Sequence, residues 1–208
     1  MSRQLDKKQI DEALERLNQR MFYQQMESIG IVVCGAAALV ARNLVSRSTS
    51  DVDILALADL RSRGRTEVSF LQEKELPDKL IELISDVGNE LHIRQDWLNF
   101  KAISVFQYGL PPGIEKRLER KKYGECLTVF FLTKHDQIHL KLLAALDPEQ
   151  GERHLSDLLD LQPQDENSTV KAAVGWLLNR KVSTDYKRKL KQVLDRIGHE
   201  RIAAEIPD

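Results

Sequence analysis

A β-branched segment that runs through a glycine into an alanine-rich stretch constrains the fold of this chain more than any other feature. Ile29–Val33 is typical of a short buried strand, and Ala36–Arg42 favours a helix. Gly35 stands between them and predicts a tight turn. Free backbone N–H groups at such a turn can hold a phosphate. The alternative is that the glycine only ends the strand and lets the helix pack closely on a sheet.

Two acids follow at the start of the next expected strand. Asp51-Val52-Asp53-Ile54 leads into a continuous apolar run that reaches Leu57. Side chains alternate along a strand, so Asp51 and Asp53 should project from the same face. Two neighbouring carboxylates repel each other unless they share a proton or bind a hard divalent cation. The pair therefore predicts a metal site, and the alternative is a strand entrance that faces water.

The remaining pattern predicts an α+β fold with a helical C-terminal part. Apolar residues recur at three or four positions from Leu5 to Met26, and a second helix is expected at Leu76–Val87 with Gly88 after its end. Short strands are expected at 91–94, 103–106, 114–122 and 125–132. Helices are expected at 135–146, 152–161, 170–179 and 185–197. We therefore expect an α/β core over residues 1–133 and a helical part over residues 134–208 packed on it.

The charge balance argues against an overall attraction to nucleic acid or to a membrane. The formal net charge is −1, so any basic surface must be local. The runs Lys116–Lys122 and Lys187–Lys191 are either solvated faces or contacts for RNA or tRNA. Cys34 and Cys126 lie in apolar stretches and are expected to be buried free thiols. No apolar run approaches the ~18 residues of a membrane span, so we expect a cytoplasmic protein without a membrane partner.

Two strings of the sequence belong together: Gly35-Ala36-Ala37-Ala38-Leu39 and Arg47-Ser48-Thr49-Ser50-Asp51-Val52-Asp53-Ile54. They resemble the first motif of the polymerase-β-type nucleotidyltransferase superfamily, in which a Gly-Gly or Gly-Ser turn precedes an Asp-x-Asp strand. The lead-in to the acids is similar to that of the bacterial group that includes AbiEii-type toxins and related uncharacterised proteins. The segments 96–99, 139–147 and 155–161 are similar to later parts of the same group. The resemblance spans residues 29–161.

The resemblance implies a nucleotidyltransferase-like mixed sheet flanked by helices. It also implies metal-dependent transfer of a nucleoside monophosphate from a nucleoside triphosphate to a hydroxyl of RNA, protein or a small molecule. Mg²⁺ would bind Asp51 and Asp53, which would be catalytic together with Lys141 and Asp157. The nucleotide would contact Gly35, Ala36, Arg47, Lys141 and Asp160. The toxin members of the group also imply a cognate partner protein.

Several of these residues have a second interpretation. Arg47 could pair with either acid of the strand instead of holding a phosphate. Lys141 lies among leucines, where a long stem can reach water. Asp157 and Asp160 share a helix face that is either solvated or packed. In the packed case one of them could orient Lys141 or act as a base.

Two positions depart from the pattern of active members. Ala36 stands where many carry serine or a second glycine, which removes a hydroxyl donor to phosphate. A third carboxylate from a neighbouring strand usually completes the metal site, and Asp96 is a candidate by its order along the chain, following an expected strand. The alternative function is a catalytically inactive nucleotidyltransferase-fold module that binds a partner protein or RNA through its helical C-terminal part.

Overall fold

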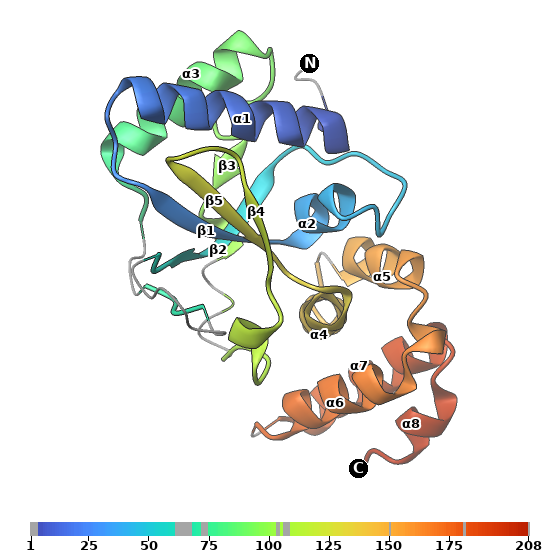
Figure 1. Ribbon diagram of the computed structural model, residues 1–208. Coiled ribbons are helices and arrows are strands. Elements are labelled where there is room, and N and C mark those ends of the chain that lie inside the picture. Colours follow the sequence, from blue (N-terminus) through green and yellow to red (C-terminus); the bar gives the residue numbers. More distant parts are fainter. Residues whose placement is uncertain are drawn as a thin grey trace. The chain divides into compact units, whose positions relative to one another are not determined.

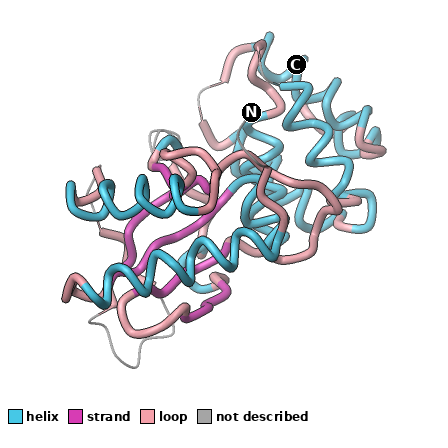
Figure 2. The backbone as a smooth tube through the Cα atoms, turned by 90° about the horizontal axis from the view of Figure 1, so that it is seen from above, coloured by secondary structure: helices cyan, strands magenta, loops and turns pink. Residues whose placement is uncertain are grey.

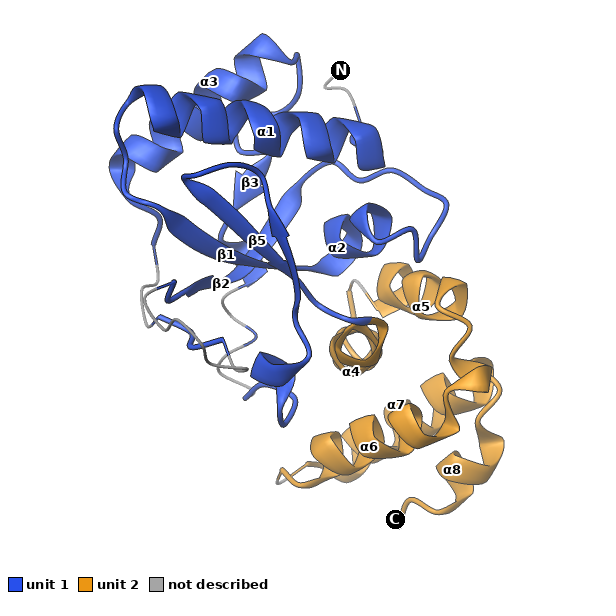
Figure 3. Cartoon of the chain, in the orientation of Figure 1, with its two compact units in different colours: residues 1–133 blue, residues 134–208 orange. Residues whose placement is uncertain are grey.

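The computed structural model confirms the α+β fold class. It describes residues 4–60, 68–71, 75–102, 105, 109–149, 151–180 and 182–207. The chain divides into two compact units, residues 1–133 and residues 134–208 (Figure 3). Unit 1 contains a mixed sheet with helices, and unit 2 is built from helices.

The sheet of unit 1 has five strands in the order β3-β2-β1-β5-β4 (Figure 1). The strands are β1 Ile29–Cys34, β2 Val52–Ala58, β3 Leu98–Asn99, β4 Glu119–Lys122 and β5 Leu127–Phe131. The central strand β1 pairs antiparallel with β2 and parallel with β5, β2 pairs parallel with β3, and β4 pairs antiparallel with β5. All of β5 and nearly all of β1 are buried, which explains why both read as continuous apolar runs.

Three helices belong to unit 1: α1 Lys7–Tyr23, α2 Gly35–Ala41 and α3 Asp78–Glu90. In Figure 2 the strands of this unit form one group with helices beside them. The apolar stripe of α1 is buried as its spacing predicts, and Asp6 caps the helix by accepting from the backbone N–H of Gln9. Arg20 donates to Glu90 at 2.8 Å and lies 3.4 Å from Asp86, which joins α1 to α3.

The β4–β5 hairpin turns at Tyr123-Gly124 as expected, and a side chain of α1 holds it. Asn18 Oδ1 accepts the backbone N–H groups of Cys126 and Leu127 at 3.0 and 3.1 Å. A Cβ atom on Gly124 would stand 2.0 Å from Asn18 Nδ2, so only glycine fits there. Asn18 is itself buried, and the hairpin is thereby fixed to the helix that covers the sheet.

Unit 2 contains α4 Lys134–Ala144, α5 Gly151–Asp160, α6 Asn167–Leu178, α7 Thr184–Arg196 and α8 Glu200–Ala204. The helix α4 packs on both α5 and α6, and α7 packs on α8. The first four lie close to the predicted ranges, whereas α8 was not predicted because five residues show too little periodicity. None of the helices in the part of the chain that the structure describes is long and apolar enough to cross a membrane.

Two expectations for the region before β3 are wrong. Residues 91–94 form a turn and not a strand. The second helix, α3, begins at Asp78 and continues to Glu90, so Gly88 lies inside it. A Cβ atom on Gly88 would stand 2.5 Å from the backbone O of Arg94, which shows that the glycine allows the following turn to approach the helix closely.

One expectation beyond β3 is also wrong in part. Ile114–Lys116 forms a 3₁₀ turn, and the first strand of the hairpin begins only at Glu119. The strand expected at 103–106 lies outside the described residues except for Val105. Pro111 and Gly113 come directly before the turn, and Gly113 has a φ of +72°, which suits a turn and not a strand.

Candidate functional site

The two acids lie at the start of β2, near the middle of the sheet. Asp51 comes directly before the strand, Asp53 is its second residue, and both residues are half-buried. Asp53 is in register with Cys34 of β1 on one side and with Asn99 of β3 on the other. The sheet therefore fixes the backbone of the acid pair from both sides.

Gly35 and Asp53 lie together, although they are far apart in the sequence. Gly35 is the first residue of α2 and has a φ of +67°, a conformation that favours glycine. A Cβ atom placed there would stand 3.2 Å from Asp53 Oδ2. Ala36 follows in α2 and is buried. The second carboxylate of the pair therefore faces the turn between β1 and α2.

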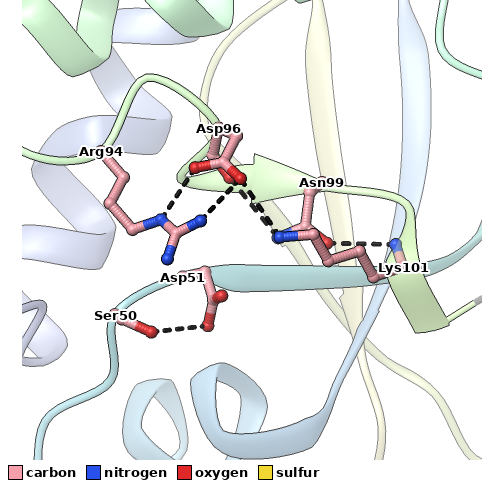
Figure 4. A network of polar contacts seen from close by, with 6 residues as sticks. All are labelled: Ser50, Asp51, Arg94, Asp96, Asn99 and Lys101. Carbon is pink, nitrogen blue, oxygen red and sulfur yellow. Dashed lines mark hydrogen bonds and ion pairs between the residues drawn. The ribbon is translucent and has the colours of Figure 1, made fainter.

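The surroundings of Asp51 are polar and contain a cation that the sequence did not indicate. Ser50 Oγ donates to Asp51 Oδ1 at 3.1 Å. In Figure 4 one nitrogen of the Arg94 guanidinium group points toward Asp51. The hydrogen bonds and charge of Asp96 raise the pKa of Arg94, and the charge of Asp51 adds to that rise. Arg94 therefore lies within electrostatic reach of the acid pair.

Asp96 accepts hydrogen bonds from two cationic side chains, Arg94 and Lys101. Nε and Nη2 of Arg94 donate to its two oxygens at 2.8 and 2.7 Å, and Lys101 Nζ donates at 3.1 Å (Figure 4). These partners hold the pKa of Asp96 well below its usual range. Asp96 also precedes β3 and does not follow a strand as expected. A metal ion that used Asp96 as a third ligand would have to replace these ion pairs.

The residue beside Asp53 on the neighbouring strand is an amide. Asn99 pairs with Asp53 in the parallel β2–β3 register and is buried. Its Oδ1 accepts the backbone N–H of Lys101 at 3.0 Å, and its Nδ2 donates to the carbonyl of Asp96 at 3.5 Å. Within the part of the chain that the structure describes, no group of three or more His, Cys, Asp or Glu residues is arranged to hold a metal ion.

Arg47 lies in the loop that leads to β2. It is half-buried, and its Nη1 donates to the carbonyl of Ser48 at 3.4 Å. A shallow surface pocket beside this loop is lined in part by Arg47, Ser48 and Val40. Arg47 and the acid pair both lie in unit 1.

Lys141 and Asp157 form a buried ion pair within unit 2. Lys141 Nζ lies 2.6 Å from Asp157 Oδ2, and their side chains are 7% and 4% exposed. His154 Nδ1 lies 3.4 Å from the same ammonium. Burial lowers the pKa of His154, and the charge of Lys141 lowers it further. The interpretation of Lys141 as a side chain that reaches water is therefore wrong, and the pair joins α4 to α5.

Asp160 does not share the surroundings of Asp157. Asp160 is exposed, whereas Asp157 is buried against Lys141. The solvated interpretation thus holds for Asp160 and fails for Asp157. Unit 2 contains the predicted residues Lys141, Asp157 and Asp160, while unit 1 contains Gly35, Ala36, Arg47, Asp51 and Asp53.

Comparisons with known protein families, with curated proteins and with solved structures give no match for this chain. The resemblance to nucleotidyltransferases therefore depends on the motifs of the sequence. Arg94, Asn99 and Lys101 were missed as members of the site. Their signal in the sequence is the segment Asp96-Trp97-Leu98-Asn99 with a cation on either side, and only the β2–β3 register relates it to the acids.

Proposed function

We propose that the chain is a metal-dependent nucleotidyltransferase that moves a nucleoside monophosphate from a nucleoside triphosphate to a hydroxyl of RNA, protein or a small molecule. One observation carries the proposal: the Asp53 carboxylate on β2 lies against the Gly35 turn that begins α2, with Asp51 two residues earlier. A carboxylate pair beside a glycine turn puts cation-binding oxygens next to backbone that a phosphate can approach.

The donor set fits Mg²⁺. Asp51 and Asp53 offer half-buried carboxylate oxygens, which are the hard ligands that this ion prefers, and a magnesium site in proteins commonly uses one or two carboxylates together with substrate phosphates. When bound, the ion would neutralise charge on the phosphate oxygens during transfer. The oxygen of an acceptor hydroxyl would then form a bond to the α-phosphorus and lose its proton to water, while the bond to pyrophosphate breaks and pyrophosphate leaves with the electron pair.

The protein's own contribution is orientation and charge. The sheet pairs β2 with β1 and β3, which holds the acid pair in place before substrate arrives. Gly35 has no side chain that would obstruct a phosphate. The sequence motif is what supports a role for Lys141 in nucleotide binding. Its contacts with Asp157 and His154 support a role in holding α4 on α5.

The test is transfer of label from each α-labelled nucleoside triphosphate in the presence of Mg²⁺ and total RNA or protein. We expect wild type to label an acceptor and the variant Asp51→Asn with Asp53→Asn to lose labelling. Asp86→Asn is a matched control, because Asp86 is an acid of the same unit that pairs with Arg20 on the α1–α3 surface. Equal labelling by wild type and the double variant would rule out the proposal.

A second candidate function is a catalytically inactive nucleotidyltransferase-fold module that binds a cognate partner protein or RNA. The observation that favours it is Asn99, an amide in register with Asp53, together with the engagement of Asp96 by two cations. A site with two carboxylates binds a divalent cation less strongly than one with three.

Thermal melting with ligands separates the two candidates. A ligand that binds only the folded state stabilises it by about 2.7 kcal/mol at a concentration of 100 Kd. A Mg²⁺-dependent rise in melting temperature with one triphosphate favours the enzyme. No rise with any triphosphate, combined with capture of RNA or a partner protein, favours the module.

A further inference from the structure

A guanidinium group lies near Asp51, the first acid of the pair, and is held there by Asp96. Arg94 lies in the turn between α3 and β3, and two of its nitrogens donate to Asp96. That bidentate arrangement fixes the plane of the guanidinium group. The third nitrogen points toward Asp51 in Figure 4.

The main chain of Arg94 is fixed as well. Its carbonyl oxygen lies where a side chain on Gly88 would stand, so the turn lies directly on α3. Trp97, which is fully buried, donates from Nε1 to the carbonyl of Ile84 at 2.9 Å. A buried indole with a satisfied N–H anchors the segment that carries Arg94. The position of the cation is therefore a property of the fold.

A fixed cation changes the electrostatics of the two acids. Neighbouring carboxylates repel each other, and a resident positive charge relieves that repulsion as a bound metal ion would. The same charge also repels an incoming divalent cation. Arg94 has 38% of its side chain accessible, so solvent and salt screen part of its charge.

We propose that Arg94 is a resident counter-charge near Asp51 and that it lowers the affinity of the Asp51–Asp53 pair for a divalent cation. Asp96 acts as a positioning residue, because it holds the guanidinium group away from full contact with Asp51. The inference rests on one part of the proposed function, namely that Asp51 and Asp53 bind a divalent cation.

The test is titration of the full chain with Mn²⁺ alone. Binding is measured by calorimetry or from the paramagnetic signal of the free ion. We expect Arg94→Gln to bind Mn²⁺ roughly tenfold more tightly than wild type at low ionic strength, with a smaller difference at high salt. Arg94→Lys keeps the charge and should stay close to wild type. Arg42→Gln is the matched control, because Arg42 is 36% exposed and pairs with Glu119 away from Asp51.

A double-mutant cycle tests the role of Asp96. We expect Asp96→Asn to weaken Mn²⁺ binding, because the released guanidinium group can pair fully with Asp51. In the Arg94→Gln background the same substitution should have a much smaller effect. Equal effects of Asp96→Asn in both backgrounds would show that Asp96 acts by its own charge and would overturn its positioning role.

The outcomes separate this inference from the proposed function. Mn²⁺ binding that is lost in Asp51→Asn with Asp53→Asn but is equal in wild type and Arg94→Gln would overturn the inference and leave the metal site standing. Tighter binding by Arg94→Gln without any nucleotidyl transfer would support the inference and count against the enzyme. No Mn²⁺ binding by any of these proteins would overturn the inference, and the labelling assay would then decide the proposed function by itself.

Discussion

A Cβ atom placed on Gly35 would stand 3.2 Å from the Oδ2 atom of Asp53, which joins the first turn of α2 to the acid pair of β2. Gly35→Ala would therefore combine an unfavourable positive φ with a tight contact to a carboxylate. The positive φ alone should lower the free energy of unfolding by about 1–2 kcal/mol. Urea denaturation measures this loss.

Gly109→Ala is the control for Gly35→Ala. Gly109 has a φ of +73°, and no atom of the described residues lies within 4 Å of the position of a Cβ, so we expect the conformational cost to dominate. We expect Gly35→Ala to lower stability more than Gly109→Ala and to weaken Mn²⁺ binding, whereas Gly109→Ala should leave Mn²⁺ binding unchanged. Equal effects on stability and on Mn²⁺ binding would show that Gly35 does not constrain Asp53.

Gly88→Ala should destabilise the protein, although alanine is the better helix former. The new Cβ atom would stand 2.5 Å from the backbone O of Arg94, and such overpacking costs about 2 kcal/mol. Gly175→Ala in α6 is the matched substitution in a helix with open space around the Cβ position, and it should stabilise by up to about 1 kcal/mol. Thermal melting should show a lower melting temperature for Gly88→Ala and a higher one for Gly175→Ala than for wild type.

Lys141→Met should destabilise unit 2, because it leaves the Asp157 carboxylate buried without its cation. Removing one partner of a buried ion pair costs about 3 kcal/mol or more. Lys141→Met together with Asp157→Leu should recover most of this loss, since two apolar side chains of similar volume replace the pair. Urea denaturation monitored by the fluorescence of Trp176, with Trp97 replaced by Phe in every protein compared, measures the two effects in unit 2.

The doubly substituted protein also tests Lys141 in function. If Lys141 serves only to join α4 to α5, the stable double variant should keep the labelling activity of wild type. Loss of activity in a folded double variant would instead support a role of Lys141, of Asp157 or of both in the transfer.

The stability of unit 2 should depend on the charge of His154. Burial and Lys141 lower the pKa of His154 from its usual 6.5, so the unfolded chain binds the proton more readily than the folded chain. The stability that neutral His154 contributes is therefore complete above about pH 6.5. It is lost as the pH falls through the pKa that His154 has in the folded chain. Denaturation of wild type and His154→Gln from pH 7.5 to 4.5 measures this, and the difference between the two curves should shrink toward acid pH. Parallel curves would contradict the prediction.

The strands and helices that a local pattern encodes could be predicted from the sequence. The buried strands β1 and β2 read as apolar runs, and α1 shows its stripe, because burial imposes the periodicity of the element. Glycine commonly stops helices, so the sequence predicts Gly88 after the end of the helix and not inside it. Its contact with the carbonyl of Arg94 is tertiary, and no local pattern contains it.

In the candidate site, too, the sequence predicts the residues of the local motif but not their tertiary neighbours. Asp51, Asp53 and Gly35 form a local motif, and the structure places Gly35 next to Asp53. Asn99 belongs to a strand of two residues, which is too short to show alternation, so its register with Asp53 could not be predicted. Arg94 lies near Asp51 because that register brings the preceding turn to the start of β2.

The outer strands of the sheet have a consequence for the behaviour of the protein at high concentration. An unpaired strand edge is a template on which a second molecule can add its own strand, and repeated addition produces fibres. Here β3, at one edge, has only two residues, and β4, at the other, exposes Arg120, Lys121 and Lys122. Like charges on two approaching copies repel each other, so the basic side chains of β4 should oppose the addition of a second molecule at this edge of the sheet.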